Sequence, residues 1–228
     1  DTRPWQQILG AQQPIPSRNI QKVVFFGAGG PVAAVAYQEL ASSYRLRITD
    51  VIPIGEITSY NGRQSREAPL PQLLPEPHEH SVVDVTNPLQ VDEACKGMEA
   101  IVNCTVVRPD LEKAFRVNTI GAYNVVKAAV HHNIRRVVHT GPMLMGMDSE
   151  SGDRFEYDTP GNVPPRPGRN LYGHTKYLGQ EICKTFAYYY GLEIPALYYC
   201  QFLNADSDTR NHCFSITWED SARAIRRA

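Results

Sequence analysis

The feature that most constrains the fold is an apolar run that ends in a cluster of glycines and continues as a helix. The stretch reads Ile20-Gln-Lys-Val-Val-Phe-Phe-Gly27-Ala-Gly29-Gly30-Pro31-Val32-Ala33. Glycines let a backbone approach a pyrophosphate closely, and the free N–H groups at the start of the following helix favour its negative charge. Proline suits the first helical turn, where a missing N–H costs nothing. The stretch therefore predicts a strand, a phosphate-binding loop and a helix.

An acid follows at the position that a dinucleotide site requires. The spacing Gly-x-x-Gly-x-x-Ala departs from the common Gly-x-Gly-x-x-Gly, and Gly29 is an extra glycine. The next apolar run ends at Asp50, about twenty residues further on, where a carboxylate can accept hydrogen bonds from ribose hydroxyls. The alternative is an ordinary strand, turn and helix whose glycines only let the chain turn. Asp50 favours the dinucleotide, and it favours NAD because a carboxylate would repel the 2′-phosphate of NADP.

The composition limits the class of protein. With 228 residues, of which 42% are apolar, the chain can bury one substantial core. A formal net charge of -1 without a long basic run argues against nucleic acid as a partner. We expect neither a membrane span nor a signal peptide, because no apolar run approaches about 18 residues and the N-terminus is polar. Cysteines without a Cys-x-x-Cys pair indicate reduced thiols, and together these features predict a cytoplasmic protein.

Apolar strands alternate with helical patterns along most of the chain. We expect strands over residues 20–26, 44–50, 81–85, 100–104, 136–140 and 194–200, and helices over 31–43, 88–96, 109–133 and 171–190. This order predicts an α/β protein with a Rossmann-type, doubly wound parallel sheet covered by helices on both faces. Ligands of such sheets bind beyond the carboxyl ends of the strands.

Three segments stand outside this alternation. Residues 1–19 carry three prolines and predict a surface arm, which leaves 20–200 as the dinucleotide-binding domain. Residues 51–80 carry five prolines and predict a long loop, either functional near the adenosine half or in subunit contact, or a neutral insertion. Residues 201–228 follow the last predicted strand, and the family resemblance described below implies that they are a remnant of a C-terminal substrate-binding region.

A tyrosine and a lysine one helical turn apart supply candidate chemistry. The sequence Tyr172-Gly-His-Thr-Lys176 places a phenol and an ammonium on one face of a helix. A phenol has an unperturbed pKa of about 10, and a neighbouring cation favours its anion. Such a pair can exchange a proton with a substrate oxygen while a nicotinamide carries hydride.

From about Ile20 through Tyr199 the chain resembles the extended short-chain dehydrogenases/reductases, in the NAD-dependent epimerase/dehydratase branch. The stretches that carry the resemblance are residues 27–33, 50, 83–85, 103–105, 117–125, 136–140, 172–181 and a late segment at 217–225, where an acidic pair opens a helix. Several motifs in the right order are more specific than any one of them.

The resemblance implies which residues bind NAD. The glycine loop lines the pyrophosphate, Asp50 holds the adenosine ribose, and residues 84–85 contact adenine. The cofactor-binding positions that it implies are Gly27, Gly29, Gly30, Pro31, Val32, Asp50, Asp84, Val85, Asn103, Thr105, Tyr172 and Lys176.

The resemblance also implies catalytic roles. Tyr172 is the acid/base, and Lys176 favours the ionised phenol and binds the nicotinamide ribose. Asn118 matches an asparagine of the family, although a helix asparagine that bonds to backbone explains it equally well. The family's Ser or Thr position falls on Gly141, so Thr140 serves only if the following loop shifts its register. Thr140 is otherwise a strand-end residue.

The expected function is an NAD-dependent epimerase/dehydratase-like oxidoreductase, acting on a nucleotide sugar through transient hydride transfer. A reductase or dehydrogenase of a small carbonyl substrate is one alternative. A non-catalytic dinucleotide-binding sensor or scaffold is another, favoured by Gly141 and by a C-terminal substrate lobe that is short for the family. The resemblance implies a homodimer through residues 115–130 and 177–188. We expect no metal at His78-x-His80 or at His131-His132, because no Cys or acid accompanies either at ligand spacing.

Overall fold

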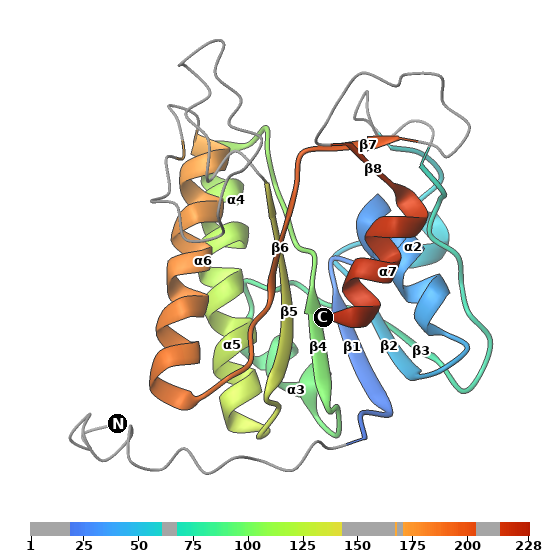
Figure 1. Cartoon of the computed structure of the whole chain (residues 1–228), viewed down its shortest axis with the longest axis horizontal. Coiled ribbons are helices and arrows are strands. Elements are labelled where there is room, and N and C mark those ends of the chain that lie inside the picture. The colour runs from blue at the N-terminus through green and yellow to red at the C-terminus, as the bar shows by residue number, and fades with distance from the viewer. Residues whose placement is uncertain (1–18, 61–67, 143–166, 168–170, 204–214) are drawn as a thin grey trace.

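The fold is a six-stranded parallel sheet with helices on both faces (Figure 1), as the sequence predicts. The structure, a computed structural model, describes residues 19–60, 68–142, 167, 171–203 and 215–228, so most of the expected N-terminal arm lies outside the described residues. The strand order is β3-β2-β1-β4-β5-β6. The strands are β1 (Lys22–Phe26), β2 (Arg45–Asp50), β3 (Glu79–Val82), β4 (Ala100–Asn103), β5 (Arg136–Pro142) and β6 (Ala196–Tyr199).

Alternating side chains of β1 supply two cores, one on each face of the sheet. Val24 and Phe26 face a cluster that includes side chains of α3 (Pro88–Cys95), α5 (Ala122–His131) and α6 (Leu171–Tyr190). Val23 and Phe25 face a second cluster under α2 (Pro31–Leu40) and α7 (Trp218–Arg227). A strand that is apolar on both faces is expected for a parallel sheet between two helical layers. None of the described helices is both long and apolar enough to cross a membrane.

The helix predicted over residues 109–133 is divided. It begins as α4 (Leu111–Phe115) after Asp110, whose carboxylate caps it by accepting a hydrogen bond from the Lys113 amide at 2.9 Å. It then widens into a π-helical segment, η3 (Arg116–Gly121), before α5. Helical spacing of apolar residues does not distinguish an α turn from a π turn, so the sequence could not predict this widening.

The third strand lies earlier than predicted. It spans Glu79–Val82, whereas the apolar pattern pointed to residues 81–85. The amide of Val83 still donates to the Asp50 carbonyl at 2.8 Å, but Asp84 then accepts hydrogen bonds from the Thr86 amide and hydroxyl. This local turn ends the strand, because an aspartate side chain competes with the sheet for backbone groups.

The proline-rich stretch 51–80 is attached to the fold at a few described residues, while most of its described residues are exposed. It contains a short 3₁₀ helix, η1 (Ile54–Glu56), and Ile54 is buried in the cluster beneath α2. The Tyr37 hydroxyl of α2 donates to the Gln72 carbonyl at 2.9 Å and accepts from the Gln72 amide at 2.6 Å. These contacts attach the stretch to α2.

The last residues of the chain pack on the first helix. After β7 (Gln201–Leu203) and β8 (Ser215–Thr217), which pair in parallel, α7 lies alongside α2 (Figure 1). Thr217 caps α7 by accepting from the Asp220 amide, and the helix opens with Glu219 and Asp220 as the resemblance implied. Acids in a first helical turn are stabilised by the helix dipole. Buried Ala222 and Ile225 join the core beneath α2, so this helix covers the sheet.

Candidate active site

Two cavities adjoin at the carboxyl ends of the strands. The first, of about 510 Å³, lies at the ends of β1, β2 and β4, and it is lined by Gly27, Asp50, Val51, Val83, Asp84, Val85, Thr86, Thr105, Val106, Val107, Asp110, Glu112, Lys113, Arg116 and Val117. The second, of about 630 Å³, is lined by Gly30, Pro31, Val32, Ala33, Cys104, Val106, Arg108, Thr140, Gly141, Pro142, Tyr172, Lys176, Tyr199, Cys200, Phe202 and Trp218. The glycine loop lies between them, and Val106 lines both.

The glycine loop has the backbone geometry of an anion cradle. Gly27 has φ +73°, and a Cβ there would lie 2.8 Å from the Thr105 backbone. Gly30 is the N-cap of α2 without a side-chain capping hydrogen bond, and Pro31 follows it. The amides at the start of α2 therefore remain open to an anion, which a diphosphate would supply.

Asp50 fixes the same loop from the end of β2. Its Oδ2 accepts a hydrogen bond from the Gly29 amide at 2.8 Å, and its Oδ1 accepts from the Ile52 amide at 3.3 Å. A Cβ on Gly29 would lie 2.3 Å from the Ile57 side chain and 3.0 Å from Asp50 Oδ2, which explains the extra glycine. The carboxylate also lines the first cavity, together with Asp84 and Val85. The structure thus brings these three sequence-predicted residues to one cavity.

A buried hydrogen-bond chain runs from β4 to β5. Asn103 Oδ1 accepts from the Thr105 hydroxyl at 2.7 Å and from the Thr105 amide at 3.2 Å, while its Nδ2 lies 3.3 Å from His139 Nδ1. The amide NH₂ is the donor there, so His139 Nδ1 accepts. Burial, and secondarily the nearby Lys176, hold the pKa of His139 well below its ordinary value, which keeps the imidazole neutral. Asn103 and Thr105 are therefore rigidly held beside the loop.

Lys176 is a buried ammonium at the floor of the second cavity. It is 2% exposed, and its Nζ donates to the Thr105 carbonyl at 3.3 Å. Burial lowers its pKa from 10.5 to about 8. Tyr172 lines the same cavity, with the Arg108 guanidinium 5.2 Å from its ring centroid. The structure thus brings the tyrosine, the lysine and a second cation together.

Thr140 and Gly141 both line the second cavity, at the end of β5. The Thr140 hydroxyl donates to the Asn103 carbonyl at 3.2 Å. Thr140 pairs with Leu197 and Gly141 with Tyr198 in one unbroken parallel register, so no shift occurs within the strand. The Thr140 proton is engaged with backbone, while the oxygen can still accept a hydrogen bond.

Asn118 lies in η3 and holds other parts of the site in place. It is 2% exposed; its Oδ1 accepts from the Val107 amide, and its Nδ2 donates to the Val107 carbonyl and to the Thr175 hydroxyl. These bonds connect the loop after β4 to α6. The interpretation as an asparagine that bonds to backbone agrees with its two contacts to Val107, and the bond to Thr175 adds a side-chain partner.

Sequence reasoning missed several residues that line the second cavity, four of which carry a charge or an aromatic ring. These four are Arg108, which follows the 103–105 motif, and the aromatic residues Tyr199, Phe202 and Trp218. The rings of Phe202 and Trp218 stack with centroids 4.3 Å apart and planes 5° from parallel. The sequence could have indicated Trp218 alone, because this residue lies in the late segment that resembles the family. The stack itself could not be predicted, because Phe202 and Trp218 are brought together by the pairing of β7 with β8.

Comparison with known proteins agrees with this geometry. Residues 27–214 match the sequence profile of the NAD dependent epimerase/dehydratase family. The L-arabinose 1-dehydrogenase (NAD(P)(+)) of Haloferax volcanii is 26% identical over 196 residues, which are 81% of this chain and 68% of that protein.

Solved structures share the fold at lower identity. The uronate dehydrogenase of Agrobacterium tumefaciens superposes with a TM-score of 0.70 at 22% identity, covering 90% of this chain and 70% of that one. The UDP-glucose 4-epimerase of Thermus thermophilus, in complex with NAD, superposes with a TM-score of 0.69 at 16% identity, covering 91% of this chain and 74% of that one.

Proposed function

Because the chain belongs to the NAD dependent epimerase/dehydratase family, we propose that it is an NAD-dependent oxidoreductase acting on a hydroxyl group of a sugar. The observation that carries this proposal is the second cavity. There the uncapped start of α2, Tyr172 and Lys176 face one space beside the glycine loop. When bound, NAD would supply the acceptor for the hydride that leaves the sugar carbon.

The residues of the first cavity would hold the adenosine half of the cofactor. The diphosphate would rest on the open amides of the first turn of α2, those of Val32 and Ala33, because the amides of residues 28–30 are already hydrogen-bonded and Pro31 has none. A side chain on Gly27 would collide with Thr105. The Asp50 carboxylate would accept hydrogen bonds from the ribose, and the backbone near Asp84 would face adenine.

The residues of the second cavity would accept the proton that the substrate hydroxyl loses. The ionised phenol oxygen of Tyr172 would take the proton of the substrate hydroxyl as the hydride leaves the sugar carbon. The Lys176 ammonium has three donors, and among the described residues its one hydrogen-bond acceptor is the Thr105 carbonyl, so two donors remain for a ribose. At neutral pH it stays mostly protonated because its pKa is about 8, and it would favour the tyrosinate. Because the Thr140 hydroxyl donates to the Asn103 carbonyl, its oxygen would accept a hydrogen bond from a second hydroxyl of the sugar. Asn118 would position the loop and helix that carry the other groups.

A free sugar is the substrate class that the sequence relative favours. The relative from Haloferax volcanii is named an L-arabinose 1-dehydrogenase, and such a reaction accumulates NADH. A nucleotide sugar, the expectation from the sequence, is the second candidate, since the Thermus thermophilus structure is a UDP-glucose epimerase. Epimerisation or dehydration would leave the NADH concentration unchanged.

The test is NADH formation from NAD⁺ with a panel of aldoses and sugar acids, and product chromatography with UDP-sugars. Tyr172→Phe removes only the hydroxyl, and we expect turnover to fall at least about 100-fold while NAD binding persists. His174→Ala, an exposed position on the same helix, is the matched control and should keep its activity. Turnover that survives Tyr172→Phe would contradict the assigned acid/base.

A cofactor-binding protein without turnover remains the alternative of a different class. Gly30→Asp places a carboxylate at the start of α2, where a diphosphate would lie, and it should abolish NAD binding measured by calorimetry. If the biological role survives Tyr172→Phe and is lost with Gly30→Asp, the binding role is the correct one.

The exposed face of η3, α5 and α6 would form a homodimer interface. Ile120, Tyr123, Leu178 and Tyr188 are each more than two-fifths exposed there. An apolar patch of this kind on neighbouring helices indicates a partner, and the resemblance implied the same two helices.

A further inference from the structure

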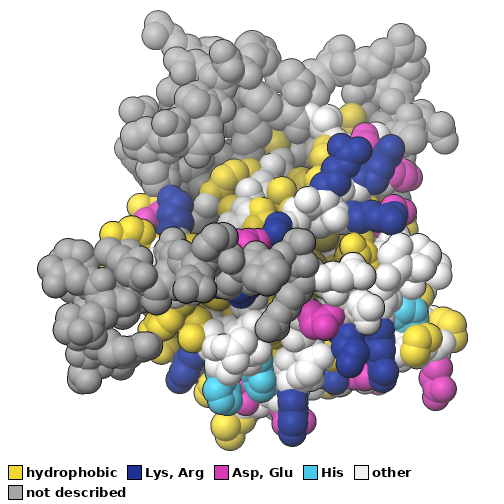
Figure 2. Space-filling view, turned by 60° about the horizontal axis from the view of Figure 1, so that its bottom comes forward, with side chains coloured by type: hydrophobic (Ala, Val, Ile, Leu, Met, Phe, Trp, Pro, Cys, Tyr) yellow, Lys and Arg dark blue, Asp and Glu magenta, His cyan; other side chains and the backbone are white. Residues whose placement is uncertain are grey.

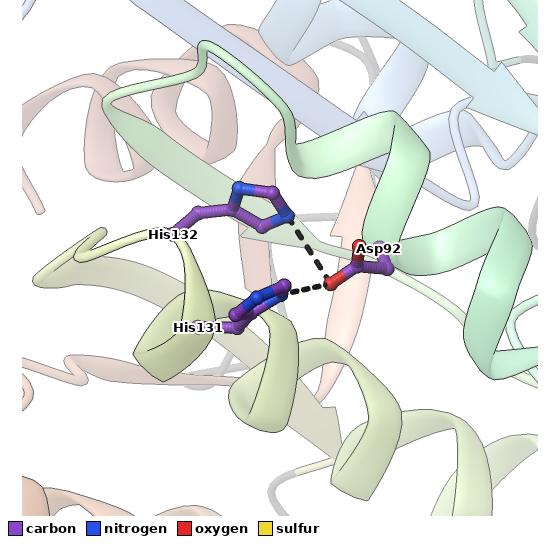
Figure 3. Close-up of side chains that lie close together, drawn as sticks. All are labelled: Asp92, His131 and His132. Atoms are coloured by element: carbon purple, nitrogen blue, oxygen red, sulfur yellow. Dashed lines mark hydrogen bonds and ion pairs between the residues drawn. The ribbon is translucent and has the colours of Figure 1, made fainter.

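Two adjacent histidines at the end of α5 meet an aspartate of α3 (Figure 3). His131 Nδ1 lies 2.6 Å from Asp92 Oδ1, and His132 Nε2 lies 3.2 Å from the same oxygen. The candidate ligand atoms of the three residues all lie within 4.8 Å of one another. α5 leads into the start of β5, so the cluster lies near the amino ends of the strands, whereas both cavities lie at their carboxyl ends.

The backbone holds this cluster in a fixed position. α5 ends at His131, and Asn133 adopts a left-handed conformation with φ 55°. The amide of buried Ile134 then returns to the Ala129 carbonyl at 2.8 Å, which closes the helix end. α3 and α5 also pack against each other in one apolar cluster. The two imidazoles and the carboxylate are therefore presented by rigid elements.

Ion pairing alone does not account for the arrangement. His132 Nε2 is a buried atom without a hydrogen-bond partner, although it lies 3.2 Å from the carboxylate oxygen. The two imidazole rings lie with centroids 4.7 Å apart, and both present a nitrogen to the same carboxylate oxygen. Imidazole nitrogens and a carboxylate oxygen are the donor set that borderline dications prefer.

We propose that Asp92, His131 and His132 bind a divalent transition metal such as Zn²⁺, which joins α3 to α5. Ligands about 2.0–2.2 Å from a tetrahedral zinc ion lie roughly 3.3 Å from one another. The separation of 3.2 Å between His132 Nε2 and Asp92 Oδ1 already has this value. The separation of 2.6 Å at His131 has to widen, which its side chain, 68% exposed, is free to do. Water would complete the coordination.

The sequence expectation of no metal rested on the lack of a neighbouring acid. Asp92 lies 39 residues before His131, and only the packing of α3 on α5 brings it into reach. The other histidine pair is engaged with backbone: His78 Nδ1 accepts from the Leu46 amide, and His80 Nε2 contacts Leu74 backbone. The absence of a metal at His78-x-His80 therefore stays a prediction, and at His131-His132 the proposal above replaces it.

The experiment is calorimetric titration of tag-free, chelator-treated protein with ZnCl₂ in the presence of a phosphine reductant. We expect one site with micromolar affinity, and no heat with MgCl₂ because Mg²⁺ prefers oxygen ligands. Asp92→Asn and His131→Ala change exposed or half-exposed groups, so both variants should fold, and each should weaken binding at least about tenfold. The control His174→Ala removes an exposed histidine elsewhere and should bind like the wild type.

Zn²⁺ should also raise the unfolding temperature of the wild type and of His174→Ala, and leave that of Asp92→Asn unchanged. Equal zinc affinity in wild type, Asp92→Asn and His131→Ala would overturn the proposal, since the metal would then bind elsewhere, for example at a cysteine. The lack of any binding to the wild type would overturn it as well. Neither readout depends on the oxidoreductase activity.

Discussion

Replacing Lys176 by methionine should stabilise the protein while it impairs the site. The side chain is 2% exposed, and burial lowers its pKa from 10.5 to about 8. Each pKa unit of this shift corresponds to about 1.4 kcal/mol, so burial of the charged ammonium lowers the free energy of unfolding at pH 7 by about 3 kcal/mol. Methionine has a similar shape and no charge. It loses the hydrogen bond to the Thr105 carbonyl, worth about 1 kcal/mol, so we expect a net gain of about 2 kcal/mol.

The pH dependence of this gain has a definite sign. Below pH 8 the lysine is protonated in both the folded and the unfolded state, and the full penalty applies. Between pH 8 and 10.5 the folded protein has released the proton while the unfolded chain still holds it, so the free energy of unfolding of the wild type rises with pH relative to that of the variant. A buried lysine whose pKa is lowered by folding reduces the free energy of unfolding at every pH where the folded protein holds it charged. This cost disappears above pH 10.5, where the lysine is neutral in the folded and in the unfolded protein. The advantage of Lys176→Met should therefore shrink across this window.

Urea unfolding followed by circular dichroism at pH 7 and at pH 9.5, without cofactor, measures both quantities. The matched control is Lys184→Met on the same helix, where the lysine is exposed and pairs with Glu181. We expect the control to change stability by less than about 0.5 kcal/mol. A Lys176→Met protein that is less stable than the wild type at pH 7, or an advantage that does not depend on pH, would refute the reasoning. The same variant should bind NAD more weakly and turn over more slowly.

Three further substitutions test the packing, the cofactor preference and the interface. Gly179→Ala would place a Cβ 2.1 Å from the Asn118 carbonyl, where α6 meets η3, and should lower the free energy of unfolding by about 3 kcal/mol, measured with urea. Asp50→Asn keeps a side-chain acceptor for the Gly29 amide but removes the charge, so the ratio of NAD to NADP affinity, measured by calorimetry, should fall at least about tenfold. Leu178→Arg should shift a homodimer to monomer in sedimentation.

Each of these has a result that would contradict it. Wild-type stability for Gly179→Ala would mean that α6 and η3 separate without cost. If the ratio of NAD to NADP affinity is unchanged in Asp50→Asn, the Asp50 carboxylate does not distinguish the two cofactors. For the interface, Leu89→Arg on α3 is the control, since Leu89 is 80% exposed on another helix, and it should leave the oligomer intact. If Leu178→Arg behaves like that control, the interface lies elsewhere.

Figure 2 shows the distribution of charged side chains on one face of the molecule. On the face that Figure 2 shows, acidic and basic side chains of the described residues are interspersed, and neither sign forms a broad field. Mixed charge of this kind agrees with the net charge of -1. Long-range attraction of a polyanion requires a concentrated basic surface.

The sequence alone was sufficient where the physics is local. An apolar run that stops at glycines and restarts at Pro31 makes a strand, a turn and a helix N-terminus in any context, because the backbone and the first helical turn impose it. The alternation of helices with strands that are apolar on both faces predicts the parallel sheet, because such strands have to be covered by helices on both sides. The spacing of Tyr172 and Lys176 places them on one helical face.

Tertiary structure decided whatever depends on distant segments. The depressed pKa of Lys176 arises because α6 buries this side chain, whose Nζ contacts the Thr105 carbonyl after β4. Gly179 is required because the Asn118 carbonyl approaches it from another helix. The stack of Phe202 on Trp218 and the meeting of Asp92 with His131 likewise join residues far apart in sequence. Local sequence patterns indicate which helix, strand or turn the backbone prefers. The contacts named above form only when helices and strands pack together, so their energies can be assigned only from the folded chain.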